Sequence, residues 1–341
     1  MEKFQHGGQI YNLDGKAENF LDFSANINPL GLSEKISQTL IKNFAGVVHY
    51  PDPNATELKS ALSRRYKISA ENLILLNGAA EFFYLYCNVF RPKKILIPVP
   101  SFSEYERAAR AANCEVEFFF THAEENFHLD VKKILTKTAD CLIIGRPNNP
   151  TGNLISVEEI LKLAEKFSVV VDESFIDFLP IESARNFLSE KIFVVQSLTK
   201  IFAMPGLRLG FAVAEKNFAE KLNFSKDVWN VNFLAQKAGV AALSDEKFLQ
   251  NTRIWLEAEQ KYFVEKLSEL PIKIFSPSVN FILIRLQSKE LAAVVLKKLR
   301  DKKILVRNCA NFLGLDERYL RLAIRTRAEN NFLLEALREI L

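Results

Sequence analysis

The chain has 341 residues, of which 48% are hydrophobic and 25% are charged, as in an ordinary globular protein. Its 45 basic and 41 acidic side chains leave a net charge of +4 and no basic run, which argues against a nucleic-acid-binding protein. Four single cysteines without a CxxC pair predict neither a metal site nor a disulfide framework. The opening "MEKFQHGGQ" lacks the apolar run of a secretory signal, and no apolar stretch reaches membrane-spanning length, so the cytoplasm is the expected location.

In the first two thirds of the chain, short apolar runs alternate with helical patterns. A helix is predicted in "PDPNATELKSALSRRY", with Asn54 as its N-cap and Glu57 three residues later. Another helix, over 156–167, begins with a predicted capping box of Ser156 and Glu159. The alternation predicts a mostly parallel α/β sheet covered by helices, in a large domain over 33–244. The strand candidates are 93–99, 115–120, 140–145, 168–173 and 191–197, with a further helix at 103–112.

The pattern changes after about residue 244. A long helical stretch over 245–268 comes first, and shorter strands then mix with helices. This mixture predicts a smaller α+β domain over 245–341. Its predicted elements are strands at 279–286, 302–308 and 318–326, a helix near 289–299 and a last amphipathic helix.

The segment "SLTKIFAMPGLRLGF" (197–211) places Lys200 among mostly apolar residues. A lysine in a dry pocket has a lowered pKa and can form a Schiff base with a carbonyl group. Ser197 and Arg208 supply a hydroxyl and a planar cation, both suited to a phosphate. Taken alone, Lys200 has a plainer interpretation as a surface lysine on a turn, and Arg208 as an ordinary ion-pair residue.

Two further motifs follow predicted strands. Asp172 ends "VVVD" at the carboxyl edge of the predicted sheet, where open α/β sheets bind ligands and a carboxylate can hold a positively charged ring nitrogen. "PNNPTG" is a rigid turn that directs the amide of Asn149 to the same edge. Each residue by itself is also typical of a simple turn or helix cap.

A third motif, "NGAAEFFYLY", places Gly78 just before a predicted helix. The backbone amides of Gly78, Ala79 and Ala80 are therefore expected to be available to an anion, although many helices begin in this way. A lysine, a ring-nitrogen carboxylate, an asparagine and a set of phosphate donors together match pyridoxal phosphate.

The order of the motifs resembles the fold-type-I aminotransferase family, near the histidinol-phosphate aminotransferases, over essentially the whole chain. The motifs are NGAAE, PSFSEY, PNNPTG, VVDESF and SLTKIFAMPGLRLG. Other stretches resemble a narrower branch, the L-threonine O-3-phosphate decarboxylases of cobalamin synthesis. These stretches are QHGGQ, DFSANINPLG, VRNCANFLGLD and YLRLAIRTRAEN.

This resemblance implies the cofactor pyridoxal 5'-phosphate and a role for each residue around it. Lys200 is the implied catalytic residue, which forms the imine with the cofactor and later moves protons. Asp172 pairs with the ring nitrogen, and Asn149 donates to the ring phenolate. The other implied contacts are Phe102 stacked on the ring, with Gly78, Ala79, Ala80, Ser197 and Arg208 at the phosphate. Tyr50 is expected to reach the phosphate of a neighbouring subunit, in a homodimer; simple core packing is the alternative for Phe102 and Tyr50.

The resemblance also implies a substrate site beneath an N-terminal arm, residues 1–32. The implied substrate contacts are His6, Gly7, Asn26, Asn149, Arg307 and Arg321. Phe175 stands where the transaminases usually carry tyrosine, which removes one hydrogen-bond donor from the cofactor phenolate. Arg325 stands where ordinary relatives have glycine, and no role is assigned to it.

The implied reaction is decarboxylation of L-threonine O-3-phosphate or L-serine O-phosphate to an amino-alcohol phosphate and carbon dioxide. The alternative with the same cofactor is an aminotransferase that acts on histidinol phosphate or an aromatic amino acid. A non-enzymatic ligand sensor on this fold is disfavoured by the retained Lys200 and by the shortness of residues 1–30. A nucleotide-binding protein is disfavoured because neither GxGxxG nor GxxxxGK occurs.

Overall fold

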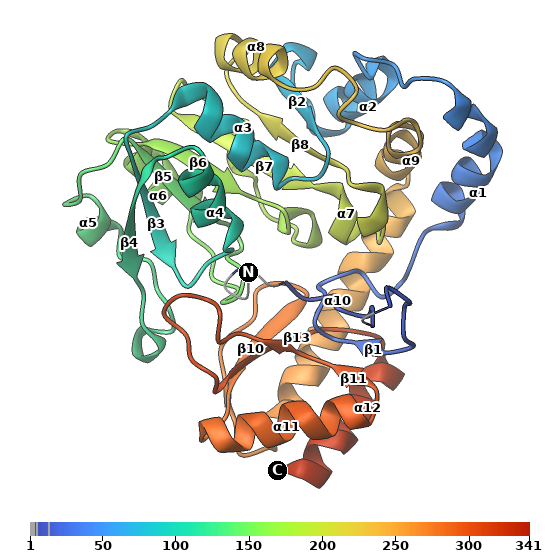
Figure 1. Cartoon of the computed structure of the whole chain (residues 1–341), viewed down its shortest axis with the longest axis vertical. Coiled ribbons are helices and arrows are strands. Elements are labelled where there is room, and N and C mark those ends of the chain that lie inside the picture. Colours follow the sequence, from blue (N-terminus) through green and yellow to red (C-terminus); the bar gives the residue numbers. More distant parts are fainter. Residues whose placement is uncertain (1–3, 5, 13) are drawn as a thin grey trace.

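A computed structural model describes residues 4, 6–12 and 14–341 of the chain. A large lobe and a smaller lobe are connected by α10 (Glu246–Leu267), which runs from one to the other (Figure 1). The predicted helix over 245–268 is therefore confirmed. None of the described helices is both long enough and apolar enough to cross a membrane.

The large lobe is organised around one sheet with the strand order β2-β8-β7-β6-β5-β3-β4. β8 runs antiparallel to β2 and β7, and the other neighbouring pairs are parallel, which confirms the predicted fold class. β2 and β8 are strands that the sequence analysis missed. In order along the sheet the strands are Leu73–Leu76, Gly210–Val213, Ile192–Ser197, Ser168–Asp172, Cys141–Gly145, Lys94–Val99 and Glu115–Phe120.

Helices cover both faces of this sheet because its strands are apolar on both faces. In β2, Ile74 and Leu76 pack into one hydrophobic cluster, whereas Leu73 and Leu75 pack into another. The large-lobe helices are α1 (Glu34–Asn43), α2 (Thr56–Tyr66), α3 (Glu81–Phe90), α4 (Glu104–Ala111), α5 (Val131–Ile134), α6 (Val157–Ala164), α7 (Leu198–Ile201), α8 (Lys216–Ser225) and α9 (Phe233–Leu243).

Two helix N-termini test the predicted caps. The capping box of Ser156 and Glu159 is present at the start of α6. The prediction for α2 is wrong, because its N-cap residue is Ala55, with a φ of 45°, and not Asn54. The Asp52 carboxylate accepts from the Thr56 amide at 2.7 Å and so supplies the side-chain acceptor at this terminus. A carboxylate also interacts more favourably than an amide with the positive end of the helix dipole.

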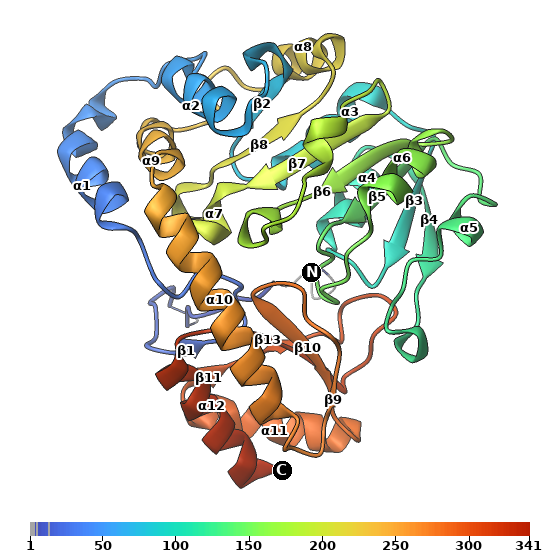
Figure 2. The ribbon, with the colours of Figure 1, turned by 180° about the vertical axis from the view of Figure 1, so that it is seen from behind.

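The small lobe contains an antiparallel sheet with the order β12-β13-β10-β9 and a parallel pair, β1-β11. The predicted strand over 302–308 is divided, since β11 pairs with β1 of the N-terminal arm, whereas β12 pairs with β13. α11 and α12 lie at the end of the small lobe farthest from the large sheet (Figure 2). These elements are β1 (Leu21–Asp22), β9 (Lys273–Ile274), β10 (Phe281–Arg285), α11 (Lys289–Asp301), β11 (Ile304–Leu305), β12 (Arg307–Asn308), β13 (Tyr319–Ala323) and α12 (Arg327–Ile340).

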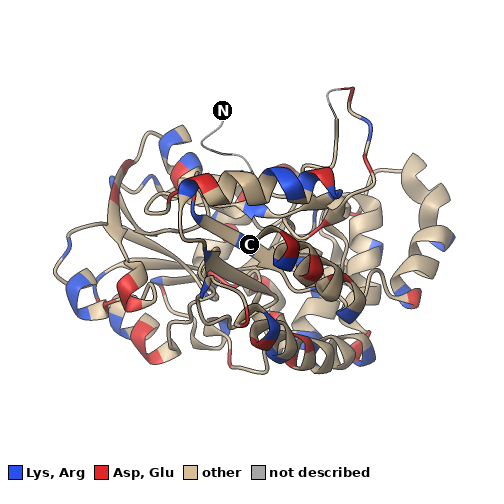
Figure 3. Ribbon diagram, turned by 90° about the horizontal axis from the view of Figure 1, so that it is seen from below, with Lys and Arg blue, Asp and Glu red and all other residues tan. Residues whose placement is uncertain are grey.

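Charged side chains of both signs are interspersed along the helices (Figure 3). Many form ion pairs on the surface, such as Lys302 with Glu339 at 2.6 Å and Arg338 with Glu269 at 2.8 Å. Exposed pairs of this kind contribute little to stability. Arg307 and Arg321, in contrast, are buried.

Candidate active site

A cavity of about 530 Å³ lies where the N-terminal arm, the large lobe and the small lobe meet. It receives side chains from the loops that follow the parallel strands, as expected for the carboxyl edge of an α/β sheet. The predicted site residues that line it are His6, Gly7, Asn26, Phe102, Asn149, Lys200, Arg208, Arg307 and Arg321. The structure therefore brings together residues that are up to 315 positions apart in the sequence, from His6 to Arg321.

Lys200 lies on α7, directly after β7, and its amine is 3.3 Å from the Thr199 hydroxyl. Burial lowers the pKa of this amine to about 8. The Asp172 carboxylate acts in the opposite direction, whereas the positive charges of Arg208 and Arg321 lower the pKa further. A larger fraction of the amine is therefore neutral near pH 7 than for an exposed lysine, as a nucleophilic amine requires.

Asp172 is the last residue of β6, at the predicted edge of the sheet. Its two oxygens accept from the Tyr105 hydroxyl at 2.7 Å and from the Ser174 amide at 2.9 Å. Burial and the neighbouring Asp172 carboxylate raise the pKa of Tyr105 well above its usual value. Tyr105 is thus a neutral donor that fixes the carboxylate in place.

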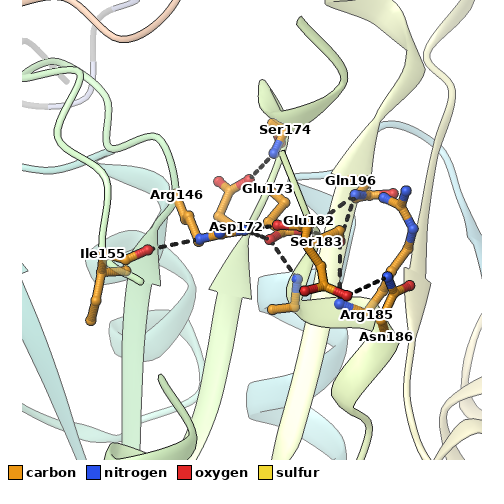
Figure 4. Close-up of polar contacts among 11 residues, drawn as sticks. Arg146, Ile155, Asp172, Glu173, Ser174, Glu182, Ser183, Arg185, Asn186 and Gln196 are labelled. Carbon is orange, nitrogen blue, oxygen red and sulfur yellow. Dashed lines mark hydrogen bonds and ion pairs between the residues drawn. The ribbon is translucent and has the colours of Figure 1, made fainter. Parts of the chain in front are cut away.

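A buried ion pair holds Glu173, the residue that follows Asp172 (Figure 4). Arg146, directly after β5, donates to the Glu173 carboxylate at 2.6 Å and to the Ile155 carbonyl at 2.8 Å. Glu173 also accepts from the Ala184 amide at 2.9 Å and from the Ser183 hydroxyl. Because the charges are buried but well hydrogen-bonded, the network holds the ends of β5 and β6 together next to Asp172.

The other end of the cofactor site is suited to a phosphate. Among the described residues, the amides of Gly78, Ala79 and Ala80 find no acceptor, and they precede the first turn of α3. A Cβ on Gly78 would lie 2.1 Å from Arg208 Nη2, so only glycine lets the guanidinium approach this backbone. Ser197 lies at the end of β7, with its hydroxyl 2.7 Å from that of Thr199.

Between these two ends lie residues suited to the cofactor ring. Phe102 lies in the cavity wall, with its ring centre 5.4 Å from that of His6. The Asn149 side-chain oxygen accepts from Arg321, so its NH₂ group is the part of the side chain that can donate to a ligand. Phe175 lines the same cavity and packs edge-on against Phe281, with 5.2 Å between the ring centres.

Two arginines lie directly opposite each other on neighbouring strands, Arg307 on β12 and Arg321 on β13. Arg321 donates to the Ser24 carbonyl at 2.7 Å, and burial lowers its pKa to about 10. Like charges in register destabilise a sheet unless something compensates them. Arg321 Nε and Asn26 Oδ1 are buried and have no hydrogen-bond partner within the described chain. This side of the cavity is therefore suited to an anionic, hydrogen-bonding ligand.

The N-terminal arm lies close against this pair. A Cβ on Gly7 would lie 2.1 Å from the Ser24 carbonyl oxygen, so glycine permits the close contact. The Gly8 amide donates to the Ser24 hydroxyl at 2.8 Å. Arg325 lies outside the cavity lining and donates to the Asp22 carbonyl at 3.0 Å, which ties the arm to the small lobe.

Of the predicted site residues, Tyr50, Gly78, Ala79, Ala80, Asp172 and Ser197 do not line the cavity. Tyr50 lies on a separate surface. Its side chain is 77% exposed and stacks on Trp229, with 4.4 Å between ring centres. It lines a separate surface depression together with Val48 and Phe233.

Sequence reasoning missed several residues that hold the site together: Thr199, Tyr105, Ser24 and Glu104. All four are polar residues inside the quoted motifs SLTKIFAMPGLRLG, PSFSEY and DFSANINPLG, but nothing in a motif shows which partner a side chain meets. Ser24 and Glu104 act through residues that are distant in the sequence. Only the folded chain reveals such contacts.

A family model described as aminotransferase class I and II matches residues 18–337. The chain belongs to this family. Membership confirms the resemblance seen in the sequence and, with it, an enzyme that uses pyridoxal 5'-phosphate. The donor set agrees, since the cavity offers an amine with a lowered pKa, a fixed carboxylate and a phosphate cradle.

Individual relatives include both decarboxylases and aminotransferases. Threonine-phosphate decarboxylase from Salmonella typhimurium is 35% identical over 98% of this chain and 96% of its own. The crystal structure of L-threonine-O-3-phosphate decarboxylase from Porphyromonas gingivalis has a TM-score of 0.84 at 30% identity, covering 93% of this chain and 98% of that one. The histidinol-phosphate aminotransferase from Clostridium acetobutylicum has a TM-score of 0.86 at 33% identity, with the same coverage. The overall fold therefore does not distinguish decarboxylases from aminotransferases. The residues on the substrate side of the cavity must make that distinction.

Proposed function

We propose that this protein removes the carboxylate of L-threonine O-3-phosphate, or of L-serine O-phosphate, as carbon dioxide and releases an amino-alcohol phosphate. A role in cobalamin synthesis follows from the resemblance to that branch. One observation carries the proposal: Arg307 and Arg321 lie in register on β12 and β13, in the same cavity as Lys200. The substrate has two anionic groups, a carboxylate and a phosphate monoester with close to two negative charges near neutrality.

On the cofactor side, the proposed contacts are Gly78, Ala79, Ala80, Phe102, Asn149, Asp172, Ser197, Lys200 and Arg208. When bound, pyridoxal phosphate supplies an electron sink for the pair left by a broken bond at the substrate α-carbon. Asp172, fixed by Tyr105, holds the ring nitrogen in its protonated form. Lys200 would hold the cofactor through its amine, whose pKa is lowered, and would carry a proton to the α-carbon.

On the substrate side, the proposed contacts are His6, Gly7, Asn26, Asn149, Arg307 and Arg321. Arg321 is itself held by the Ser24 carbonyl and the Asn149 oxygen, so it offers a fixed guanidinium to the carboxylate or the phosphate. By clamping both anionic groups, these residues would fix the orientation of the bonds at the α-carbon. The N-terminal arm excludes water from above the reacting atoms.

Carbon dioxide release in the absence of any keto acid tests the proposal. The holoenzyme is mixed with L-threonine O-phosphate alone, and carbon dioxide and the amine product are measured. Formation of both supports decarboxylation, whereas a requirement for a keto-acid acceptor supports the aminotransferase alternative. Histidinol phosphate is the matched comparison, because it carries a phosphate but no carboxylate. Parallel kinetics with L-serine O-phosphate determine whether the extra methyl group matters, a difference of about 1–3 kcal/mol in a small pocket.

We also propose a homodimer in which Tyr50 of one subunit reaches the cofactor phosphate of the other. The support is an exposed apolar face around Tyr50, of a kind that marks protein contact sites. It contains Ile41, Phe44, Val47, Val48, Tyr50 and Trp229, all at least 44% exposed. Sedimentation of the purified protein tests this arrangement, and a monomer at working concentration would contradict it.

A further inference from the structure

His6 is anchored from across the lobe boundary by a carboxylate. Its Nε2 lies 2.9 Å from Glu104 Oε1, although the two residues are 98 positions apart. His6 belongs to the N-terminal arm and lines the cavity, whereas Glu104 is the first residue of α4 in the large lobe. The contact therefore holds the arm against the large lobe at the point where the arm covers the site.

Glu104 is built into the fold independently of His6. It is buried, with 6% of its surface exposed, and its other oxygen accepts from the Tyr84 hydroxyl at 2.7 Å. Arg107 approaches Oε1 at 3.5 Å from the next turn of the helix. Burial raises the pKa of Glu104, but the hydrogen bonds from His6 and Tyr84 outweigh burial and leave the pKa below its usual value. The group is therefore an ionised acceptor at neutral pH.

The carboxylate determines which nitrogen of His6 remains for a ligand. Because ionised Glu104 can only accept, Nε2 must carry the hydrogen of this bond. Within the described chain no hydrogen-bond partner of Nδ1 is found. An anionic ligand in the cavity is thus met by a ring whose orientation is already fixed, so that little side-chain entropy is lost on binding.

We propose that Glu104 is a positioning residue for substrate recognition, which holds His6 so that its Nδ1 meets the phosphate of the substrate. The proposal rests on the proposed function for the identity of that phosphate. A phosphate oxygen can accept from Nδ1 when that nitrogen carries a hydrogen in addition to Nε2, and the Glu104 carboxylate lies at Nε2 to balance the resulting charge. Glu104 makes no hydrogen bond to a proposed cofactor contact, but its neighbour Tyr105 holds Asp172 and the His6 ring lies 5.4 Å from that of Phe102. The affinity for L-threonine therefore serves as the check that the cofactor end stays intact.

The test uses the holoenzyme and two ligands that differ by the phosphate, L-threonine O-phosphate and L-threonine. Dissociation constants come from the change in visible absorbance of the bound cofactor, and KM and kcat from carbon dioxide release. We expect Glu104→Ala to raise both the KM and the dissociation constant for L-threonine O-phosphate about tenfold, the lower end for a charge-assisted hydrogen bond. Affinity for L-threonine stays as in the wild type, and kcat changes less than KM.

Further variants separate positioning from a general loss of structure. Glu104→Gln keeps an acceptor for Nε2 and restores most of the affinity. His6→Ala weakens the binding of L-threonine O-phosphate to the same degree. The double variant with Glu104→Ala binds this ligand as tightly as His6→Ala alone, because the two residues act as a unit. If the alanine variant does not fold, Glu104→Met removes the acceptor while filling the space, and the same expectations apply.

The matched control is Glu106→Ala. Glu106 is a buried carboxylate on the same helix and pairs with Arg110 at 2.7 Å, outside the lining of the active-site cavity. The substitution should lower the stability of the protein and leave the affinities for L-threonine O-phosphate and for L-threonine unchanged. Equal weakening of L-threonine and its phosphate ester by Glu104→Ala, or additive effects of the two substitutions, would overturn the inference. Absence of carbon dioxide release in the wild type would instead overturn the proposed function, and the dissociation constants would still test Glu104.

Discussion

The two ends of the cavity are built in different ways. At the cofactor end, Asp172, Ser197 and Lys200 come from neighbouring parallel strands and the turns after them, so one rigid sheet sets their positions. At the substrate end, Arg321 from the small lobe meets Asn149 from the large lobe and Ser24 from the N-terminal arm. The cofactor end thus depends on one sheet, and the substrate end on how three parts of the chain pack together.

This difference makes the two ends separable by mutation. Substitutions at the cofactor end should change cofactor retention and chemistry together. Substitutions at the substrate end should change substrate affinity while cofactor binding persists. The experiments below test that separation, from the largest expected effect to the smallest.

Lys200→Ala should have the largest effect. It removes both the amine that attaches the cofactor and the proton donor to the α-carbon, so carbon dioxide release should fall by at least about a thousandfold. The visible absorbance of bound cofactor and borohydride-resistant labelling at position 200 should also disappear. The matched control is Lys226→Met, because burial likewise lowers the pKa of Lys226 to about 8 but this residue lies outside the cavity lining. A labelled, active Lys200→Ala protein would contradict the assignment.

Arg321→Ala should act mainly on the substrate end. Loss of a buried guanidinium that binds an anionic group should lower kcat/KM about 100-fold, while the absorbance of the bound cofactor is retained. Arg321→Lys should rescue little, because an ammonium cannot replace the planar fork that also meets Asn149 and Ser24. Arg318→Ala, which breaks a surface pair with Asp316 just before β13, serves as the control and should be close to wild type. If Arg321→Ala lost both cofactor affinity and substrate affinity, the two ends of the cavity would not be separable by mutation.

Tyr50→Ala tests whether the cofactor end also needs a second subunit. Loss of one hydrogen bond to the phosphate should weaken cofactor affinity about tenfold. Mixed dimers of Tyr50→Ala and Lys200→Ala chains should regain tight cofactor binding at one site, because the intact Tyr50 of one chain then serves the intact Lys200 of the other. If mixing does not restore tight cofactor binding, Tyr50 acts within its own subunit instead.

The pH dependence of cofactor capture tests the Lys200 amine without any substitution. Burial lowers the Lys200 pKa to about 8, so about a tenth of the amine is neutral at pH 7. The rate at which the cofactor-free protein captures pyridoxal phosphate should therefore rise about tenfold per pH unit below 8 and level off above it. Stopped-flow absorbance between pH 6 and 9.5 measures this profile. A rate that still rises steeply up to pH 9.5 would mean that the amine is not desolvated.

The cofactor end could be predicted because its information is local. Lys200, Ser197 and Arg208 lie in one segment, and Asp172 ends an apolar run whose length identifies a buried strand. The substrate residues were named only through resemblance to a known branch, since nothing near Arg307 or Arg321 shows that they face each other. A strand was predicted over 302–308, but its division was not, because the two halves pair with strands that are distant in the sequence.

The sequence by itself determined the alternation of strands and helices, five of the seven strands of the large sheet and the residue types of the cofactor site. These follow from periodicity and from short motifs, which depend on neighbours along the chain. Only the tertiary structure decided that Tyr105 fixes Asp172, that Arg321 meets Asn149 and that Glu104 anchors His6. Such contacts join residues 67, 172 and 98 positions apart, and they exist only because packing the two lobes and the arm brings the chain back on itself.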